Sequence, residues 1–256
     1  MSSQRVTFEN ESGIRLAGII DTAEGTPLAY AVFAHCFTCT KDLKAIVKIS
    51  RQLAKQSISV LRFDFSGLGN SGGRFEESNF ETNLADLRAA VNWLSETHAA
   101  PQLLIGHSLG GAAAMASVQG FESVKALATL AAPSCTAHLA DFLASQNPAI
   151  ETSGAGTVTI GGRDHMITTQ LLASLRGYDL ETPIRAIQVP HLILHSPEDA
   201  TVAYSCAQDL FEWTSGAKTL LGLPGSDHLL LNQRQDANWV ADCIAVWAGR
   251  FFESQN

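Results

Sequence analysis

The apolar positions of this chain recur with two different periods, and the two alternate from one end of the chain to the other. Six short runs are apolar almost throughout and predict buried strands, at residues 28–35, 58–65, 102–107, 124–132, 191–196 and 217–223. Between them, apolar residues at helical spacing predict helices, at residues 41–56, 79–98, 202–214 and 236–252 and from Leu109 onward. This alternation predicts an α/β fold with a mostly parallel sheet of about eight strands and helices on both faces.

The beginning of the chain has a different strand pattern. Residues 5–10 and 14–20 are both strand-like, and the turn residues 11–13 lie between them. This arrangement predicts a β-hairpin. We expect the hairpin to add an antiparallel edge to the sheet.

Residues 133–189 break the regular alternation. Two stretches there have helical spacing, residues 137–146 and 169–177, and a third alternates around a Gly-Gly pair, residues 156–168, which predicts a hairpin. The segment is too structured for a long loop and too short for an independent domain. We therefore expect one domain over residues 1–256, with residues 133–189 inserted as a cap, or lid, over one end of the sheet.

The charge balance narrows the choice of partners. The 256 residues include 17 basic and 25 acidic side chains, which gives a formal net charge of −8 at pH 7. A negative chain without a basic cluster argues against a nucleic-acid partner. The start of the chain does not resemble a signal peptide, and no run of about 18 apolar residues occurs, so we expect no membrane span and a cytoplasmic location.

Five cysteines are scattered along the chain: Cys36, Cys39, Cys135, Cys206 and Cys243. An odd number of cysteines in a protein of cytoplasmic type predicts reduced thiols. The C-x-x-C spacing of Cys36 and Cys39 also occurs in redox and metal sites. A single such pair is weak support for either role, so we expect neither a metal nor another cofactor.

The most informative stretch is residues 103–118, LLIGHSLGGAAAMASV. It contains the pattern G-x-S-x-G, from Gly106 through Ser108 to Gly110, between a predicted strand and a helix of small residues. This context is that of a nucleophile elbow, a turn so sharp that side chains at the two glycines would collide with backbone. The alternative is that Ser108 only caps the helix. A base and an acid elsewhere in the chain would indicate the catalytic role.

A serine nucleophile requires a base and an acid that orients the base, and in an elbow hydrolase the acid and then the histidine follow later strands. Glu198 and Asp199 come directly after one predicted strand, and His228 lies in a loop after the next. We assign Asp199 as the acid, because its shorter side chain suits a buried bond to the imidazole, whereas Glu198 is expected to face solvent or cap a helix. Asp227 is a poorer candidate, since neighbours on a loop usually diverge.

The oxyanion hole requires two backbone N–H groups. One is expected from Leu109, and the other from the loop after the strand at residues 28–35. We assign Phe37 as this second donor and keep Cys36 as the alternative. The glycine-rich residues 64–73 are expected to border the same site as a structural loop. His35 and His107 are expected to hydrogen-bond the loops that carry the site. His195 is expected to have a structural role.

Several motifs together resemble a known family. The segments GHSLGG (residues 106–111), SPEDATV (196–202) and GSDHLLL (225–231) resemble the α/β-hydrolase superfamily. HCFTCTKD (35–42) and VLRFDFSGLGNSGG (60–73) look like a bacterial group of hydrolases, some of which are fused to an OsmC-type domain. We expect no such second domain here. The resemblance implies ester or acyl hydrolysis, although Cys36 stands where the family usually has glycine.

The function expected from these residues is that of a serine esterase acting on a small-molecule ester through Ser108, His228 and Asp199. A small cap favours short acyl chains. A thioesterase, a lactonase or a carbon–carbon bond hydrolase would use the same side chains, and a non-catalytic ligand-binding module could have the same fold. The sequence does not predict the physiological substrate or the oligomeric state.

Overall fold

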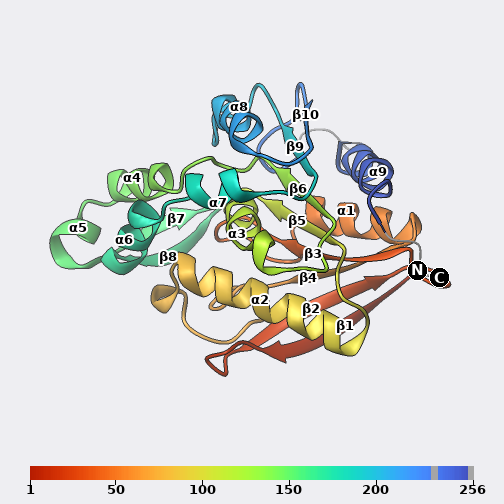
Figure 1. Ribbon diagram of the computed structural model, residues 1–256. Helices are drawn as coiled ribbons and strands as arrows, with labels where there is room; N and C mark the ends of the chain where they lie inside the picture. The colour runs from red at the N-terminus through yellow and green to blue at the C-terminus, as the bar shows by residue number, and fades with distance from the viewer. Residues whose placement is uncertain (232–235, 253–256) are drawn as a thin grey trace.

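The computed structural model describes residues 1–231 and 236–252 of the chain (Figure 1). Its centre is an eight-stranded sheet with the order β1-β2-β4-β3-β5-β6-β9-β10. The strands are β1 (Ser2–Glu9), β2 (Arg15–Thr22), β3 (Ala29–Ala34), β4 (Ile58–Phe63), β5 (Leu103–His107), β6 (Ala126–Leu130), β9 (His191–His195) and β10 (Lys218–Gly222). All neighbours from β4 to β10 are parallel, and the opening hairpin β1–β2 adds the antiparallel edge. The predicted fold class is therefore confirmed.

Among the described residues, five α-helices outside the segment between β6 and β9 cover the two faces of this sheet: α1 (Lys44–Lys55), α2 (Phe80–Thr97), α3 (Leu109–Ser117), α8 (Tyr204–Trp213) and α9 (Asp236–Ala248). Helices α1 and α9 lie together on one face, and α2, α3 and α8 pack on the other (Figure 1). Val32 and Phe33, neighbours on β3, belong to opposite cores. Because both faces are covered, every residue of β4, β5, β6 and β9 is buried, which explains why these runs are mostly apolar.

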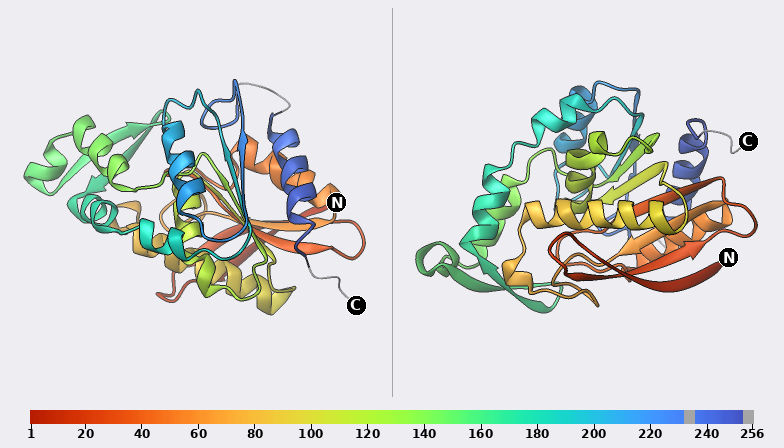
Figure 2. Two further views of the ribbon diagram at one scale, coloured as in Figure 1. Left: turned by 45° about the horizontal axis from the view of Figure 1, so that its top comes forward. Right: turned by 60° about the horizontal axis from the view of Figure 1, so that its bottom comes forward.

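The chain between β6 and β9 makes the excursion expected from its irregular pattern. It contains α4 (Ala137–Gln146), α5 (Ala149–Ser153), β7 (Ala155–Ile160), β8 (Arg163–Thr168), α6 (Thr169–Gly177) and α7 (Glu181–Ala186). Strands β7 and β8 pair as the predicted hairpin, and Gly161 and Gly162 form its turn with φ values of +58° and +76°. Both further views show this excursion projecting from the sheet (Figure 2). Its role as a cap stays a prediction.

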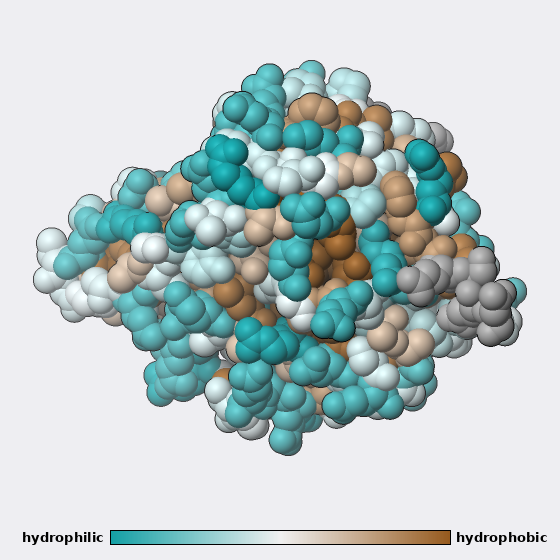
Figure 3. Space-filling model, viewed as in Figure 1, coloured by the Kyte–Doolittle hydropathy of each residue, from teal (hydrophilic) through white to brown (hydrophobic). Residues whose placement is uncertain are grey.

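Hydrophilic side chains cover most of the face shown in Figure 3, and the visible hydrophobic ones gather in a central hollow and toward the side of α9. On α9 the exposed apolar side chains include Trp239 and Val246. They border a shallow groove with Leu221 on the edge strand β10. Within residues 1–231 and 236–252, no helix is long and apolar enough to cross a membrane.

Candidate active site

Ser108 lies at the sharp turn between β5 and α3. Its backbone has φ +52° and ψ −121°, a conformation that residues other than glycine rarely adopt. Its hydroxyl makes no capping hydrogen bond to the helix that follows. The alternative of a simple helix cap is therefore excluded, and the strained turn is the one that the elbow pattern predicts.

The glycines on both sides of Ser108 have a steric reason. A Cβ atom on Gly106 would lie 2.4 Å from the carbonyl oxygen of Gly110. A Cβ atom on Gly110 would lie 2.4 Å from the carbonyl oxygens of both Ala34 and His35. The elbow thus packs directly against the end of β3, where the loop that carries Phe37 begins.

Three side chains from separate loops meet at the carboxyl end of the sheet in one line of hydrogen bonds. The Oγ atom of Ser108, after β5, lies 3.1 Å from Nε2 of His228. The Nδ1 atom of His228, in the loop after β10, lies 2.8 Å from Oδ2 of Asp199, which follows β9. Ser108 is 9% exposed, and Asp199 is buried. In this order of side chains, the histidine can accept the proton of the serine hydroxyl and the carboxylate can stabilise the resulting imidazolium.

The carboxylate of Asp199 is held in place by its own loop. Its Oδ1 atom accepts hydrogen bonds from the N–H groups of Thr201 (2.8 Å) and Val202 (3.0 Å), which leaves Oδ2 for His228. Burial alone would raise the pKa of Asp199, but the hydrogen bonds from His228 and these N–H groups hold that pKa below its ordinary value. The carboxylate is therefore ionised at neutral pH.

The other two acidic candidates lie elsewhere. The exposed Glu198 accepts hydrogen bonds from the hydroxyl of Ser196 and, at 3.0 Å, from the N–H of Gly225, so it links the loops of Asp199 and His228. Asp227 accepts a hydrogen bond from the N–H of Leu231 within its own loop. Asp199, by contrast, accepts its hydrogen bond from the His228 ring, at 2.8 Å.

Two more histidines hydrogen-bond the loops that carry His228 and Asp199. Nε2 of His107 lies 2.8 Å from the carbonyl oxygen of His228 and fixes the loop after β10. Burial, together with the nearby His228, lowers the pKa of His107 to about 3, so its ring is neutral and Nε2–H donates this bond. His195 donates from Nε2 to the carbonyl oxygen of Val202 at 2.9 Å, which supports the turn around Asp199. The supporting roles predicted for these histidines are confirmed.

The peptide between Cys36 and Phe37 has a fixed orientation. The carbonyl oxygen of Cys36 accepts hydrogen bonds from Nδ1–H of His35 (2.8 Å) and from the N–H of Cys39 (3.2 Å). Nε2 of His35 in turn accepts from the N–H of Phe65 at 3.2 Å, which assigns the ring proton to Nδ1. The carbonyl of this peptide is thus held on one side, so its N–H, which belongs to Phe37, points the opposite way.

Phe37 and Leu109 line one small cavity of about 10 Å³, together with Cys36 and the loop residues Ser66 and Leu68. The glycine-rich loop thus borders this site, as predicted. Within the described part of the chain, no acceptor takes a hydrogen bond from the N–H of Phe37 or of Leu109. Both groups are therefore free to bind an oxygen atom of a ligand.

The expectation of reduced thiols is wrong for one pair. Cys36 and Cys39 form a disulfide, with their Cα atoms 5.3 Å apart. The turn at Thr38, with φ +56°, brings the two cysteines within disulfide range, which their spacing alone did not decide. Cys135, Cys206 and Cys243 are free. The thiol argument for a cytoplasmic location is weakened accordingly, and that location stays a prediction.

A buried ion pair, missed in the sequence, anchors the same loop. Nζ of Lys41 lies 2.7 Å from Oδ2 of Asp64, and both side chains are at most 4% exposed. Asp64 also accepts hydrogen bonds from the N–H groups of Lys41 and Asn70, at 2.7 and 2.8 Å. This pair joins the loop after β3 to the glycine-rich loop after β4. No three His, Cys, Asp or Glu side chains of residues 1–231 and 236–252 are grouped so that they could hold a metal ion.

A parallel sheet with a strained serine between a central strand and a helix, within reach of a histidine and a carboxylate from later loops, is the architecture of the α/β-hydrolases. A family model described as "Serine aminopeptidase, S33" matches residues 31–151. The esterase domain of a Rhodothermus marinus protein is 43% identical over 99% of this chain and 100% of that domain, with a TM-score of 0.81. The chain belongs to the esterases of the α/β-hydrolase superfamily.

Two more distant proteins are similar in fold or in part of the sequence. Est1E from Butyrivibrio proteoclasticus, solved with ferulic acid bound, is 19% identical over 96% of this chain and 98% of that chain, with a TM-score of 0.82. The uncharacterized protein RP471 of Rickettsia prowazekii is 27% identical over 47% of this chain, and the match spans only 51% of that protein's length. The first likeness concerns the fold alone.

Proposed function

We propose that this protein is a serine hydrolase that cleaves short-chain carboxylic esters through an acyl-enzyme intermediate. The observation that carries the proposal is the continuous hydrogen-bonded line from Ser108 through His228 to Asp199 at the carboxyl end of the sheet. The 43% identity to an esterase domain over 99% of the chain supports the ester as substrate. The substrate is a small molecule.

In the proposed reaction, Oγ of Ser108 attacks the ester carbonyl carbon while Nε2 of His228 accepts the hydroxyl proton. Asp199 keeps the His228 ring in the tautomer that bears a proton on Nδ1 and stabilises the imidazolium. His228 then delivers the proton to the leaving alcohol, which releases it and leaves the acyl group on Ser108. A water molecule, activated by His228, attacks the acyl-enzyme and frees the acid.

The N–H groups of Phe37 and Leu109 are the proposed oxyanion hole. The fixed Cys36–Phe37 peptide supports Phe37 as the donor from this loop, because the hydrogen bonds that hold the Cys36 carbonyl also fix the direction of the Phe37 N–H. The N-terminus of α3 adds its partial positive charge. One such donor is typically worth about 2.7–4 kcal/mol of transition-state stabilisation.

The restriction to short acyl chains rests on the shape of the site. Residues 133–189 act in this proposal as the cap that limits access to it. Ser108 is nearly enclosed, which fits a small group at the reacting carbon.

Labelling with a fluorophosphonate, followed by mapping of the adduct by mass spectrometry, tests the proposal. The adduct is expected on Ser108, and the hydrolysis of p-nitrophenyl acetate should be lost in proportion to the amount of adduct formed. The same preparation should be assayed with an acyl thioester and a lactone of matched size, which compares the alternative hydrolase reactions. Active protein without an adduct on Ser108 would contradict the proposed mechanism.

The choice of acid can be tested by a pair of substitutions. Asp199→Asn is expected to lower kcat by about 10⁴-fold, because an amide neither orients the tautomer of His228 nor stabilises the imidazolium. Glu198→Gln keeps an acceptor for Gly225 and serves as the matched control, with kcat expected within about threefold of the parent. Steady-state kinetics with p-nitrophenyl acetate measures both. An equal loss in the two variants would sink the assignment of Asp199.

Because of the disulfide, we expect a reductant to lower the activity. Opening the Cys36–Cys39 bond with a phosphine yields two thiols and releases the turn that carries Phe37, so kcat is expected to fall by about tenfold through a displaced oxyanion donor. Since the other cysteines are free, the effect is specific to this bond. The control is Cys39→Ser, whose already lower kcat should not respond to the phosphine. Full activity of the protein with both thiols confirmed by mass spectrometry would refute this prediction.

A further inference from the structure

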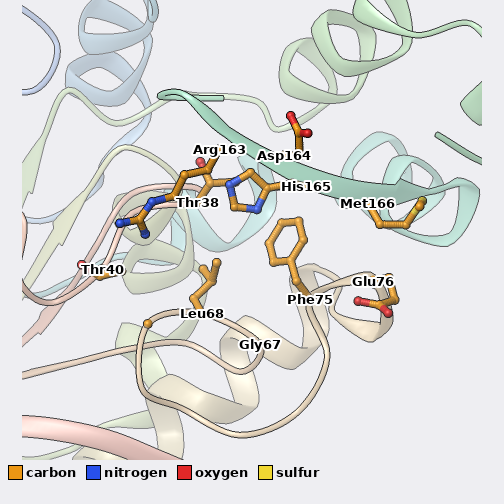
Figure 4. A pocket seen from close by; sticks show the side chains of 11 residues that line it. Thr38, Thr40, Gly67, Leu68, Phe75, Glu76, Arg163, Asp164, His165 and Met166 are labelled. Atoms are coloured by element: carbon orange, nitrogen blue, oxygen red, sulfur yellow. The ribbon is translucent and has the colours of Figure 1, made fainter. Parts of the chain in front are cut away.

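A second, larger cavity lies next to the proposed oxyanion hole. It has a volume of about 340 Å³ and is bordered by Thr38, the loop at Gly67 and Leu68, Phe75 and the strand β8 (Figure 4). Thr38, Leu68 and Phe75 line this cavity and also the small one beside Leu109. Thr38 follows Phe37 directly, so the cavity adjoins the loop that carries the proposed donor.

The hairpin β7–β8 turns a basic side chain toward this cavity. Arg163 pairs across the hairpin with Ile160, and His165 pairs with Val158, which is buried in the core. Arg163 and His165 therefore belong to the inward face of the hairpin, since side chains alternate along a strand. Figure 4 shows the Arg163 side chain extending from β8 toward Thr38 and Thr40.

The charge of Arg163 is not matched by an acidic partner. Within residues 1–231 and 236–252, no ion pair joins its guanidinium to a carboxylate. Arg74 and Arg176, by contrast, each pair with a carboxylate. Of the two carboxylates at the cavity, Glu76 accepts from Nε of Arg74 at 2.8 Å, and Asp164 accepts from the hydroxyl of Thr159 at 2.6 Å on the outer face. Arg163 is thus a cation at this cavity that, among the described residues, is held in no ion pair.

His165 supplies a second polar group without a partner. Its ring packs edge-on against Phe75, with the ring centroids 5.0 Å apart. Its Nε2 atom is buried and finds no hydrogen-bond partner among the described residues. A buried polar atom that lacks a partner costs free energy, and a ligand that accepts or donates a hydrogen bond there would recover it.

We propose, on the basis of the proposed esterase function, that this cavity binds a carboxylate of the substrate, with Arg163 as its cation. The preferred substrates are then esters that bear a free carboxylate a few bonds from the reacting carbonyl. A chain with a net charge of −8 disfavours anions in general, so such a substrate requires a local cation. A guanidinium suits this role because it can form two parallel hydrogen bonds to one carboxylate.

The test compares charged and uncharged esters of matched length in a pH-stat assay. Monomethyl adipate is paired with methyl hexanoate, which places the carboxylate on the acyl side. The acetyl ester of 4-hydroxybutanoate is paired with butyl acetate, which places it on the alcohol side. Each pair is measured with the parent, with Arg163→Gln and with Arg163→Lys, and Arg5→Gln, an exposed arginine on the edge strand β1, is the control.

Arg163→Gln is expected to lower kcat/KM for the charged ester of one pair by about tenfold and to leave its neutral partner unchanged. Arg163→Lys should retain part of the preference, Arg5→Gln all of it, and added salt should weaken it. An unchanged ratio of charged to neutral ester in Arg163→Gln would overturn the carboxylate site while leaving the esterase function intact. If the parent hydrolysed p-nitrophenyl acetate but none of the four esters, the carboxylate site would be overturned, and if it hydrolysed none of the five, the proposed function itself would fail.

Discussion

Ser108→Ala is expected to abolish ester hydrolysis, with kcat lowered by about 10⁴-fold or more, because no other group in the site can form the acyl-enzyme. The fold should be unaffected. Ser108 makes no capping bond, and alanine has the same backbone requirements at φ +52° as serine. Hydrolysis of p-nitrophenyl acetate and thermal unfolding followed by circular dichroism measure the two effects.

Ser117→Ala is the matched control, since Ser117 lies on the same helix, at the end of α3 distant in sequence from the elbow. Its activity and midpoint of unfolding should match those of the parent. Turnover by Ser108→Ala at the parent rate would disprove the role of Ser108. A large fall in the melting temperature of Ser108→Ala would instead assign the serine a structural role.

Gly110→Ala is expected to destabilise the protein by about 3 kcal/mol or more, which is a large value for one methyl group. The added Cβ would lie 2.4 Å from the carbonyl oxygens of Ala34 and His35. These are backbone atoms of the central strand β3 and of the loop that follows it, and they cannot move aside as a flexible side chain can. The elbow or the oxyanion loop must therefore shift, so the activity should fall together with the stability.

Gly120→Ala is the control for this substitution. A Cβ atom on Gly120 would meet nothing within 4 Å, and its φ lies outside the left-handed region. Its free energy of unfolding in urea should stay within about 0.5 kcal/mol of the parent. Equal stability of Gly110→Ala and Gly120→Ala would show that the elbow tolerates a side chain, against the geometry described above.

The residues of the proposed reaction were predictable because each follows a strand. In a parallel sheet, the carboxyl ends of the strands meet at one edge, so Ser108 after β5, Asp199 after β9 and His228 after β10 converge although 120 residues separate the first from the last. The elbow also has a local signal, since its glycines are required by the turn itself. Sequence order and local sterics were sufficient for these positions.

The elements that the sequence did not predict are short. Helices α5 (Ala149–Ser153) and α7 (Glu181–Ala186) have five and six residues, too few for a helical period to emerge. Pro148 directly precedes the first, and Pro183 lies within the second. Prolines at such positions are compatible with the first turn of a helix. In a sequence pattern, however, a proline indicates the end of a helix.

By itself, the sequence determined the layered α/β fold, the strained turn at Ser108 and the order of serine, aspartate and histidine, because these depend on periodicity and on local backbone geometry. Only the tertiary structure decided that Cys36 and Cys39 are joined, that Lys41 pairs with Asp64, and that Arg163 faces a cavity beside Phe37. These features depend on distances between loops and on which face of a hairpin is packed inward. Such distances arise only when the whole chain is folded.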